Sequence, residues 1–210
     1  MAVGRTLLAL SLLVMAPFGS ASAKDAARGE ALFRLCRQCH GLEAGGNQLF
    51  GAPAIAGMSQ WYVEAQLGKF RSGLRGLHPD DLMGMRMRPM SKWLASEEDV
   101  KAVAAYLATL PPTSPARSVE GGDPATGKVL YATCAACHGV DGEGSQQLNA
   151  PALTHIDDWY ILDQLKKYKE GVRGGDTRDV SGILMRPMAI ALADDQAMKD
   201  VVAHIMTLSD

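Results

Sequence analysis

Two short cysteine and histidine motifs are the residues of this sequence best suited to chemistry. The motifs are Cys36-Arg37-Gln38-Cys39-His40 and Cys134-Ala135-Ala136-Cys137-His138. Two thiols separated by two residues can form thioether bonds to the vinyl groups of a haem, and the histidine that follows can then bind the iron. The same residue types also serve in thioredoxin-like dithiols and in zinc sites. The surrounding sequence must decide among these three chemistries.

Covalent haem attachment explains both motifs best. A thioredoxin-like dithiol follows a strand in a βαβ unit, and no convincing strand precedes either motif. A zinc site needs a second ligand pair, although a zinc ion shared between the two motifs is conceivable. Each motif is also followed, at the same distance, by methionines, whose thioether can bind haem iron opposite a histidine. The sequence therefore predicts two covalently bound haem c groups, which leave no cysteine for a disulfide.

The motifs belong to an internal repeat with an offset of 98 residues. This is too long for a solenoid unit, which has about 20–50 residues. Without a gap the offset pairs Gly29 with Gly127, Phe33 with Tyr131, Ala52-Pro53-Ala54 with Ala150-Pro151-Ala152, Trp61-Tyr62 with Trp159-Tyr160, Arg75 with Arg173, and Met87-Arg88-Pro89-Met90 with Met185-Arg186-Pro187-Met188. The repeat predicts two domains, residues 24–110 and 123–210, joined by a Pro- and Gly-containing linker at 111–122. Each domain is small enough for a large cofactor to form much of its core.

Helices are the elements that the sequence predicts around the motifs. The segments 26–37 and 125–136 are expected to be helices that run directly into the cysteines. Ser59 and Asp157 are predicted to cap the next helix of each repeat with their side-chain oxygens. The last helix of each repeat opens with acidic residues, as the helix dipole favours. The remaining segments, rich in Gly, Pro and Asn, are expected to be loops, so that the fold class is all-α.

The repeated motifs resemble those of the small class I cytochromes c. The likeness includes the Gly and aromatic residues before each cysteine pair and the late methionines. The tandem arrangement, with its A-P-A, W-Y, Q-L and G-x-R-G segments, is similar to the dihaem cytochrome c-four type. This resemblance implies two tandem class I cytochrome c domains, each a few helices wrapped around one haem, which face one another. It also implies a periplasmic carrier of single electrons that feeds a terminal oxidase or a similar respiratory acceptor.

The axial ligands of the two irons follow from the same resemblance. They are His40 and Met87 in the first domain and His138 and Met185 in the second. The choice of methionine rests on the spacing to the polar cap of the last helix, and Met90 and Met188 remain as alternatives. A thioether ligand favours ferrous iron, so both haems are expected at fairly positive potential.

Further contacts to the haems are expected from two matched pairs of residues. A haem-binding histidine normally donates its other ring N–H to a carbonyl, and the resemblance assigns this carbonyl to Pro53 for His40 and to Pro151 for His138. Arg75 and Arg173 are candidates to pair with haem propionates, because a guanidinium offers several donors in one plane. Ordinary loop prolines and surface-exposed arginines are the open alternatives. The close crossing of the first and last helix is expected at Gly29 and Gly127, since glycine has no Cβ.

The first 23 residues are predicted to be a cleaved signal peptide. They combine a positive charge at Arg5, an apolar run at 6–18 and the small-residue segment Ala21-Ser22-Ala23. The apolar run is shorter than the roughly 20 residues that a membrane-spanning helix needs. Export to the periplasm is therefore expected, and no later segment is predicted to span a membrane.

The charge of the chain limits its partners. Its 21 basic and 23 acidic residues give a net charge of −2, so nothing indicates nucleic acid. The charge is unevenly divided, because residues 24–110 carry 11 basic and 9 acidic residues and residues 123–210 carry 8 and 13. The two domains are therefore expected to face different redox proteins. These are an upstream quinol-oxidising complex or dehydrogenase and a downstream oxidase or reductase, with docking to a membrane complex as one arrangement.

Three functions compete. The first is an electron carrier without catalytic residues. The second is a dihaem electron-transfer subunit of a larger oxidoreductase, such as a flavocytochrome sulfide dehydrogenase, which the sequence separates poorly from the first. The third is a haem enzyme, such as a dihaem peroxidase or a thiosulfate dehydrogenase, which needs an open iron or an unusual ligand. The sequence argues against the third, because all four cysteines serve attachment and each domain offers a methionine to the iron.

Overall fold

The computed structural model describes residues 20–114 and 117–209, and this part of the chain is helical, with two isolated β-bridges and no longer strand. The predicted all-α class is confirmed. The predicted signal peptide lies outside the described residues except for its last four, 20–23, which belong to the first helix. The elements are α1 (Ser20–His40), the 3-10 helix η1 (Gln48–Phe50), α2 (Gln60–Ser72), α3 (Leu82–Trp93), α4 (Glu97–Thr109), α5 (Pro124–His138), α6 (Asp158–Glu170), α7 (Val180–Ile190) and α8 (Asp195–Thr207).

Each domain is organised by a close crossing of its first and last helix. α1 packs on α4, and α5 packs on α8. A Cβ on Gly29 would lie 2.0 Å from the Ala102 carbonyl oxygen, and one on Gly127 would lie 1.8 Å from that of Asp200. These crossings confirm the prediction made from the two glycines. His204 replaces Tyr106 at the second crossing, where its ring meets that of Tyr131 edge-on, with 5.2 Å between centroids.

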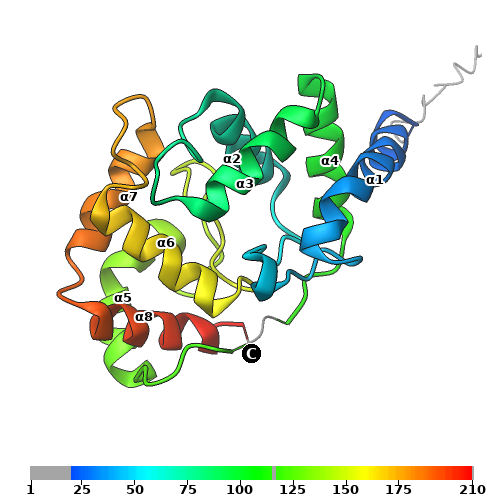
Figure 1. Cartoon of the computed structure of the whole chain (residues 1–210). Helices are drawn as coiled ribbons and strands as arrows, with labels where there is room; N and C mark the ends of the chain where they lie inside the picture. The colour runs from blue at the N-terminus through cyan, green and yellow to red at the C-terminus, as the bar shows by residue number, and fades with distance from the viewer. Residues whose placement is uncertain (1–19, 115–116, 210) are drawn as a thin grey trace, which may run out of the picture.

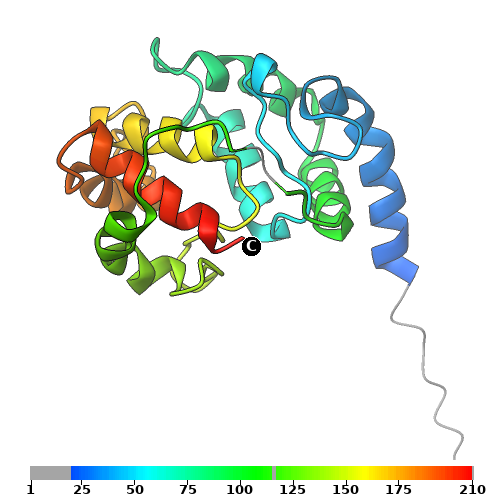
Figure 2. The same ribbon diagram turned by 90° about the horizontal axis from the view of Figure 1, so that it is seen from below.

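The two domains lie side by side, with the α1–α4 pair and the α5–α8 pair at opposite ends of the molecule (Figures 1 and 2). Each has its own apolar cluster, built mainly on α4 in the first domain and on α8 in the second. Met58, just before α2, packs against both clusters. The two domains therefore meet near the start of α2.

The helices α3 and α7 correct the prediction that these segments are loops. Both carry a proline inside the helix, Pro89 in α3 and Pro187 in α7. An interior proline removes one backbone hydrogen bond and costs about 3 kcal/mol. Each helix nevertheless starts at an aspartate whose side chain accepts a hydrogen bond from a backbone N–H of the first turn, Asp81 from Gly84 and Asp179 from Gly182. This capping and the packing of α3 on α2 and of α7 on α6 outweigh the prolines.

The predicted caps of α2 and α6 are wrong in their chemistry. Ser59 and Asp157 stand at the N-cap positions, but neither side chain makes a capping hydrogen bond. The Asp157 carboxylate instead accepts a hydrogen bond from the Ala54 N–H of the first domain, at 2.7 Å. A side chain that is drawn into a contact between domains is no longer available to its own helix.

The end of the linker is attached to the second domain. The Asp158 carboxylate accepts hydrogen bonds from the backbone N–H groups of Ser118 and Val119 and from the Ser118 hydroxyl. None of the described helices has the length and apolar character that crossing a membrane requires.

Candidate haem sites and the interface between them

The last turn of α1 delivers the first motif to a pocket. The buried His40 lies at the end of this helix, and its Nδ1 is 2.8 Å from the carbonyl oxygen of Pro53. Burial lowers the pKa of His40, and the hydrogen bond to Pro53 opposes this shift in part. The imidazole is therefore neutral near pH 7, as an iron ligand must be. With Nδ1 committed to the carbonyl, Nε2 is the nitrogen left for a metal.

The second motif repeats this geometry. His138 lies at the end of α5, with Nδ1 2.8 Å from the carbonyl oxygen of Pro151. Burial likewise lowers the pKa of His138. The contacts expected from the two prolines are thus present in the structure, and each carbonyl fixes the orientation of the histidine ring that donates to it.

The pocket beside the first motif is large and mostly apolar. It lies between α1, α2 and α3, and its empty space, counted out to the open mouth, is about 1210 Å³. Both cysteines of the motif line it, with Phe33, Leu67 and Phe70 among its apolar residues. Neither cysteine forms a disulfide, and burial raises the pKa of the Cys36 thiol. The size, the apolar lining and the two thiols at its wall suit a covalently attached porphyrin.

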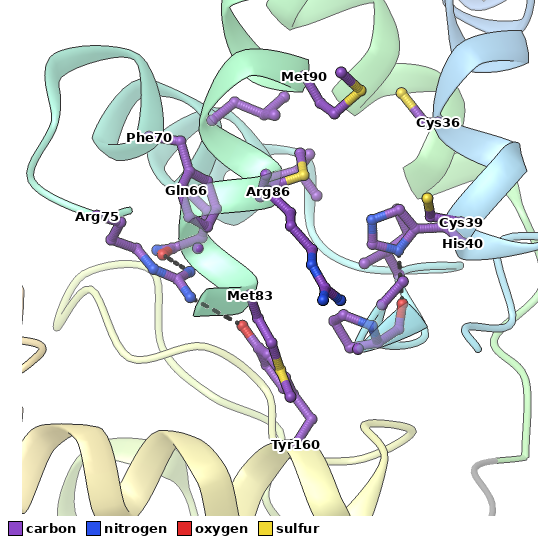
Figure 3. Close-up of a pocket in the computed structure, with 18 of the residues that line it drawn as sticks. Cys36, Cys39, His40, Gln66, Phe70, Arg75, Met83, Arg86, Met90 and Tyr160 are labelled. Carbon is purple, nitrogen blue, oxygen red and sulfur yellow. Dashed lines mark hydrogen bonds between the residues drawn. The ribbon is translucent and has the colours of Figure 1, made fainter. Parts of the chain in front are cut away.

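Three methionines of α3 line the same pocket as His40. They are Met83, Met87 and Met90, spaced by four and three residues on one face of the helix. Figure 3 shows Met90 on the side of Cys36 and Met83 beside Tyr160. Met87 is half-buried and packs against the apolar core of the first domain. The structure thus brings both candidate ligands of the first iron to the pocket.

In both domains one candidate methionine is more buried than the other. Met185 is half-buried against the core of its domain, while Met188 is 37% exposed, as is Met90. Packing holds Met87 and Met185 in place more firmly than it holds Met90 and Met188.

The two arginines meet at the domain interface, and the surface-exposed alternative for them is wrong. Arg75 and Arg173 are only 5% and 3% exposed. Arg75 donates hydrogen bonds to the side-chain oxygens of Gln66 and Gln164 and to the Tyr160 hydroxyl (Figure 3). Arg173 donates to the same two glutamines, at 2.5 Å to Gln164 and 3.3 Å to Gln66. The network therefore connects α2 and α6 in both directions.

Each of these buried guanidinium groups has an N–H donor that makes no hydrogen bond. The Nε atoms of Arg75 and Arg173 are buried without a hydrogen-bond acceptor, and so are those of Arg88 and Arg186, another pair related by the repeat. A buried cation without an anion is costly. Arg75 also lines the pocket beside Cys36. The unpartnered Nε–H of Arg75, at the wall of this pocket, fits a cofactor that brings carboxylates to the first site.

Sequence reasoning missed the glycines that hold the proline carbonyls in place. A Cβ on Gly46 would lie 2.5 Å from the Ala54 nitrogen, and one on Gly144 would lie 2.4 Å from that of Ala152. Both glycines also have positive φ, +86° and +76°. Gly46 and Gly144 are separated by the repeat offset of 98, which is the signal that could have identified them.

The described residues do not form a site that could bind a metal ion directly, without a porphyrin. In residues 20–114 and 117–209, no three His, Cys, Asp or Glu side chains gather where they could hold a metal ion. The zinc site shared between the motifs is therefore absent from the described part of the chain.

The comparisons with known proteins agree with this geometry. The sequence profile of the Cytochrome c family matches residues 26–111 and again residues 124–209. The chain belongs to the cytochrome c family. It carries two cytochrome c domains in tandem and, with them, two covalently bound haem c groups.

Two individual relatives match this chain over most of its length and most of their own length. Cytochrome c4 of Azotobacter vinelandii is 29% identical over 196 residues, which cover 87% of this chain and 87% of the relative. A thiosulfate dehydrogenase electron acceptor of Stutzerimonas stutzeri (strain A1501) is 31% identical over 182 residues, which cover 81% of this chain and 78% of the relative. This cytochrome is thus similar in extent to electron-transfer proteins.

One solved structure places the same fold within a larger protein. The thiosulfate dehydrogenase TsdBA of Marichromatium purpuratum superposes with a TM-score of 0.70 and 28% sequence identity. The match covers 87% of this chain and 40% of that one, so this cytochrome spans about two fifths of the larger chain.

Proposed function

We propose that this dihaem cytochrome is an exported, periplasmic carrier of single electrons between redox proteins. In this proposal His40 and Met87 bind one iron, and His138 and Met185 bind the other. The observation that carries it is the matched pair of histidine contacts to Pro53 and Pro151, each at 2.8 Å. Each contact orients a neutral imidazole with Nε2 free, and the first of these imidazoles lines the same pocket as the methionines of α3.

The protein's part in this function is to supply the histidine and the methionine that would hold each iron, and to exclude water. Haem iron supplies the one-electron step by alternating between the ferrous and ferric states. With a histidine nitrogen and a methionine sulfur both bound, the iron would offer no position to a substrate. The thioether raises the reduction potential relative to two nitrogen ligands, and the apolar pocket does the same by disfavouring the more highly charged ferric state.

Electron transfer between the two sites is favoured by the interface. The pocket of the first domain is lined in part by Tyr160, Gln164 and Lys167 of the second domain. The network of Arg75 and Arg173 holds this wall in place through α2 and α6. A single electron can then enter at one domain and leave from the other without a second partner between them.

The relatives suggest where the electrons come from. One is named a thiosulfate dehydrogenase electron acceptor, and the TsdBA structure contains a similar fold within a dehydrogenase chain. These names favour a dehydrogenase as the donor, while the acceptor remains the oxidase or reductase that the sequence resemblance implies. They also favour the second candidate function, in which this cytochrome is the electron-transfer subunit of such an enzyme.

Optical spectroscopy of the matured, exported protein tests the carrier. We expect two haems per chain, low-spin spectra in both oxidation states, the weak far-red band of methionine bound to ferric iron, and no change when carbon monoxide is added to the reduced protein. A high-spin component or a carbon monoxide shift in one haem would mean an open iron and would overturn the carrier in favour of catalysis.

Affinity purification from the native cells separates the two candidates. A free carrier is expected to purify without a catalytic subunit, and its rate of reduction by a donor should fall as salt screens the charges of the two domains. Stable co-purification with a catalytic subunit would favour the subunit instead.

A further inference from the structure

One peptide group of the first domain is held from both sides. Its carbonyl, from Pro53, accepts the hydrogen bond of His40, and its N–H, from Ala54, donates to the Asp157 carboxylate at 2.7 Å. Ala54 and Asp157 are 1% and 4% exposed. A continuous chain of hydrogen bonds thus runs from a predicted iron ligand of the first domain to a buried carboxylate of the second.

The second domain lacks this carboxylate. The repeat offset places Ser59 at the position of Asp157, and Ser59 is exposed. The corresponding N–H belongs to Ala152, which is only half-buried. Among the described residues this N–H meets no hydrogen-bond acceptor. The histidine, the proline carbonyl and the glycine beneath the peptide are shared by both domains, and the anion is the difference between them.

The anion changes how strongly the histidine binds iron. A carboxylate that accepts from a peptide N–H polarises the peptide, so that its carbonyl oxygen becomes a stronger acceptor. A stronger acceptor at Nδ1–H increases the electron density at Nε2 and the basicity of the ligand. A more basic ligand stabilises ferric over ferrous iron, and the negative charge acts in the same direction.

We propose that Asp157 is a positioning and tuning residue that acts across the domain boundary. Through the peptide that joins Pro53 and Ala54, it lowers the reduction potential of the haem bound by His40 relative to that of the haem bound by His138. The inference rests on the proposed function in one respect, namely that His40 is an iron ligand. It gives the two sites an order, because the electron is then drawn from the first domain towards the second.

Asp157→Asn in the full, haem-loaded protein tests the proposal. The asparagine keeps the shape and an oxygen that can accept the Ala54 N–H, but it removes the charge. We expect the potential of the His40 haem to rise. The equilibrium constant for electron transfer from this haem to the other should then fall about threefold to tenfold, where tenfold corresponds to about 59 mV for one electron. The potentials come from a spectroelectrochemical titration, with each haem assigned through proton NMR contacts to aromatic residues of its own domain.

Asp158→Asn is the matched control. Asp158 is adjacent in sequence and also buried, but it holds the linker residues Ser118 and Val119 rather than the peptide behind His40. We expect the control to leave the difference between the two potentials within about a factor of two in equilibrium constant. An equal shift in both variants would indicate a general effect of lost charge and would overturn the proposal.

A role in domain docking alone gives a different result. If Asp157 served only to hold the domains together, Asp157→Asn would lower stability and leave both potentials unchanged, which overturns the proposal. The optical spectrum separates this failure from failure of the proposed function. Two low-spin haems that do not bind carbon monoxide would still support the carrier, whatever the potentials do.

Discussion

Lys167 of the second domain lies with its Nζ 2.9 Å from the Asp81 carboxylate of the first. Asp81 is the residue that caps α3, the helix that carries Met87. The repeat mirrors this contact, because Lys69 lies 2.6 Å from Asp179, the cap of α7. Each domain thus supports the start of the other domain's methionine-bearing helix. Loss of the interface would therefore disturb both helices that carry the candidate methionine ligands, α3 with Met87 and α7 with Met185.

Lys167→Met should destabilise the protein. Lys167 and Asp81 are both buried, so the variant removes the ion-pair partner of Asp81 and leaves this carboxylate with the backbone N–H groups of Gly76 and Gly84 and the nearby charge of Arg75. Breaking one side of a buried ion pair costs about 3–5 kcal/mol, and we expect the lower end of this range. Denaturant-induced unfolding of the haem-loaded protein measures this loss.

Lys166→Met is the control for that experiment. Lys166 pairs with Asp195 at 2.6 Å, but the two side chains are 36% and 68% exposed. A surface pair of this kind is worth less than about 1 kcal/mol. Equal losses of unfolding free energy in the two variants would contradict a special role for the contact between domains.

The contact to Asp81 also predicts how stability depends on pH. Burial alone would raise the pKa of Asp81, but the hydrogen bond and charge of Lys167, with Arg75, bring this pKa below its ordinary value. A carboxyl group whose pKa is lowered by folding stabilises the folded state above its unfolded pKa of about 3.9, and this contribution is lost as the pH falls through the folded pKa. The difference in unfolding free energy between the native protein and Asp81→Asn should therefore be constant from about pH 5 to pH 8 and shrink below about pH 4. A difference that already shrinks near neutral pH would exclude this carboxylate as its source.

The sequence could predict the haem motifs and most of the helices because their causes are local. A cysteine pair, a capping aspartate or a glycine at a helix crossing depends on nearby residues and on the repeat. The helix α3 could not be predicted, because Pro89 argues against it and the support at Asp81 comes partly from Lys167 in the other domain. A signal that arises from contacts between distant residues does not appear in a local pattern.

The same limit explains the misread residues. Asp157 has the right type and position for a helix cap, and only the neighbouring domain redirects it to Ala54. Arg75 and Arg173 were recognisable as matched cations, but their burial at one interface depends on how the two domains pack. A repeat predicts what the domains share, whereas their mutual contacts require the structure.

Gly46→Ala should disturb the first haem site through the peptide behind His40. The new Cβ would lie 2.5 Å from the Ala54 nitrogen, on a backbone with φ +86°. Both the clash and the strained backbone are expected to lower stability by about 1–3 kcal/mol and to shift the potential of the first haem. Gly68→Ala is the control, since Gly68 lies inside α2 with nothing within 4 Å of the added Cβ. The control should be neutral or stabilising by up to about 1 kcal/mol, and an equal loss in both variants would contradict the role of Gly46.

The choice of axial methionine can be tested in each domain separately. Met87→Ala should open the first iron: the far-red band loses half its intensity, carbon monoxide binds one haem, and the potential of that haem falls because the thioether is lost. Met90→Ala should keep the far-red band, since Met90 is 37% exposed and Met87 is the more firmly packed of the two. In the second domain, Met185→Ala should open the iron as Met87→Ala does in the first, and Met188→Ala should keep the far-red band as Met90→Ala does. If Met90→Ala rather than Met87→Ala opened the iron, Met90 would be the ligand, and the half-buried Met87 would serve only to pack α3 against the core.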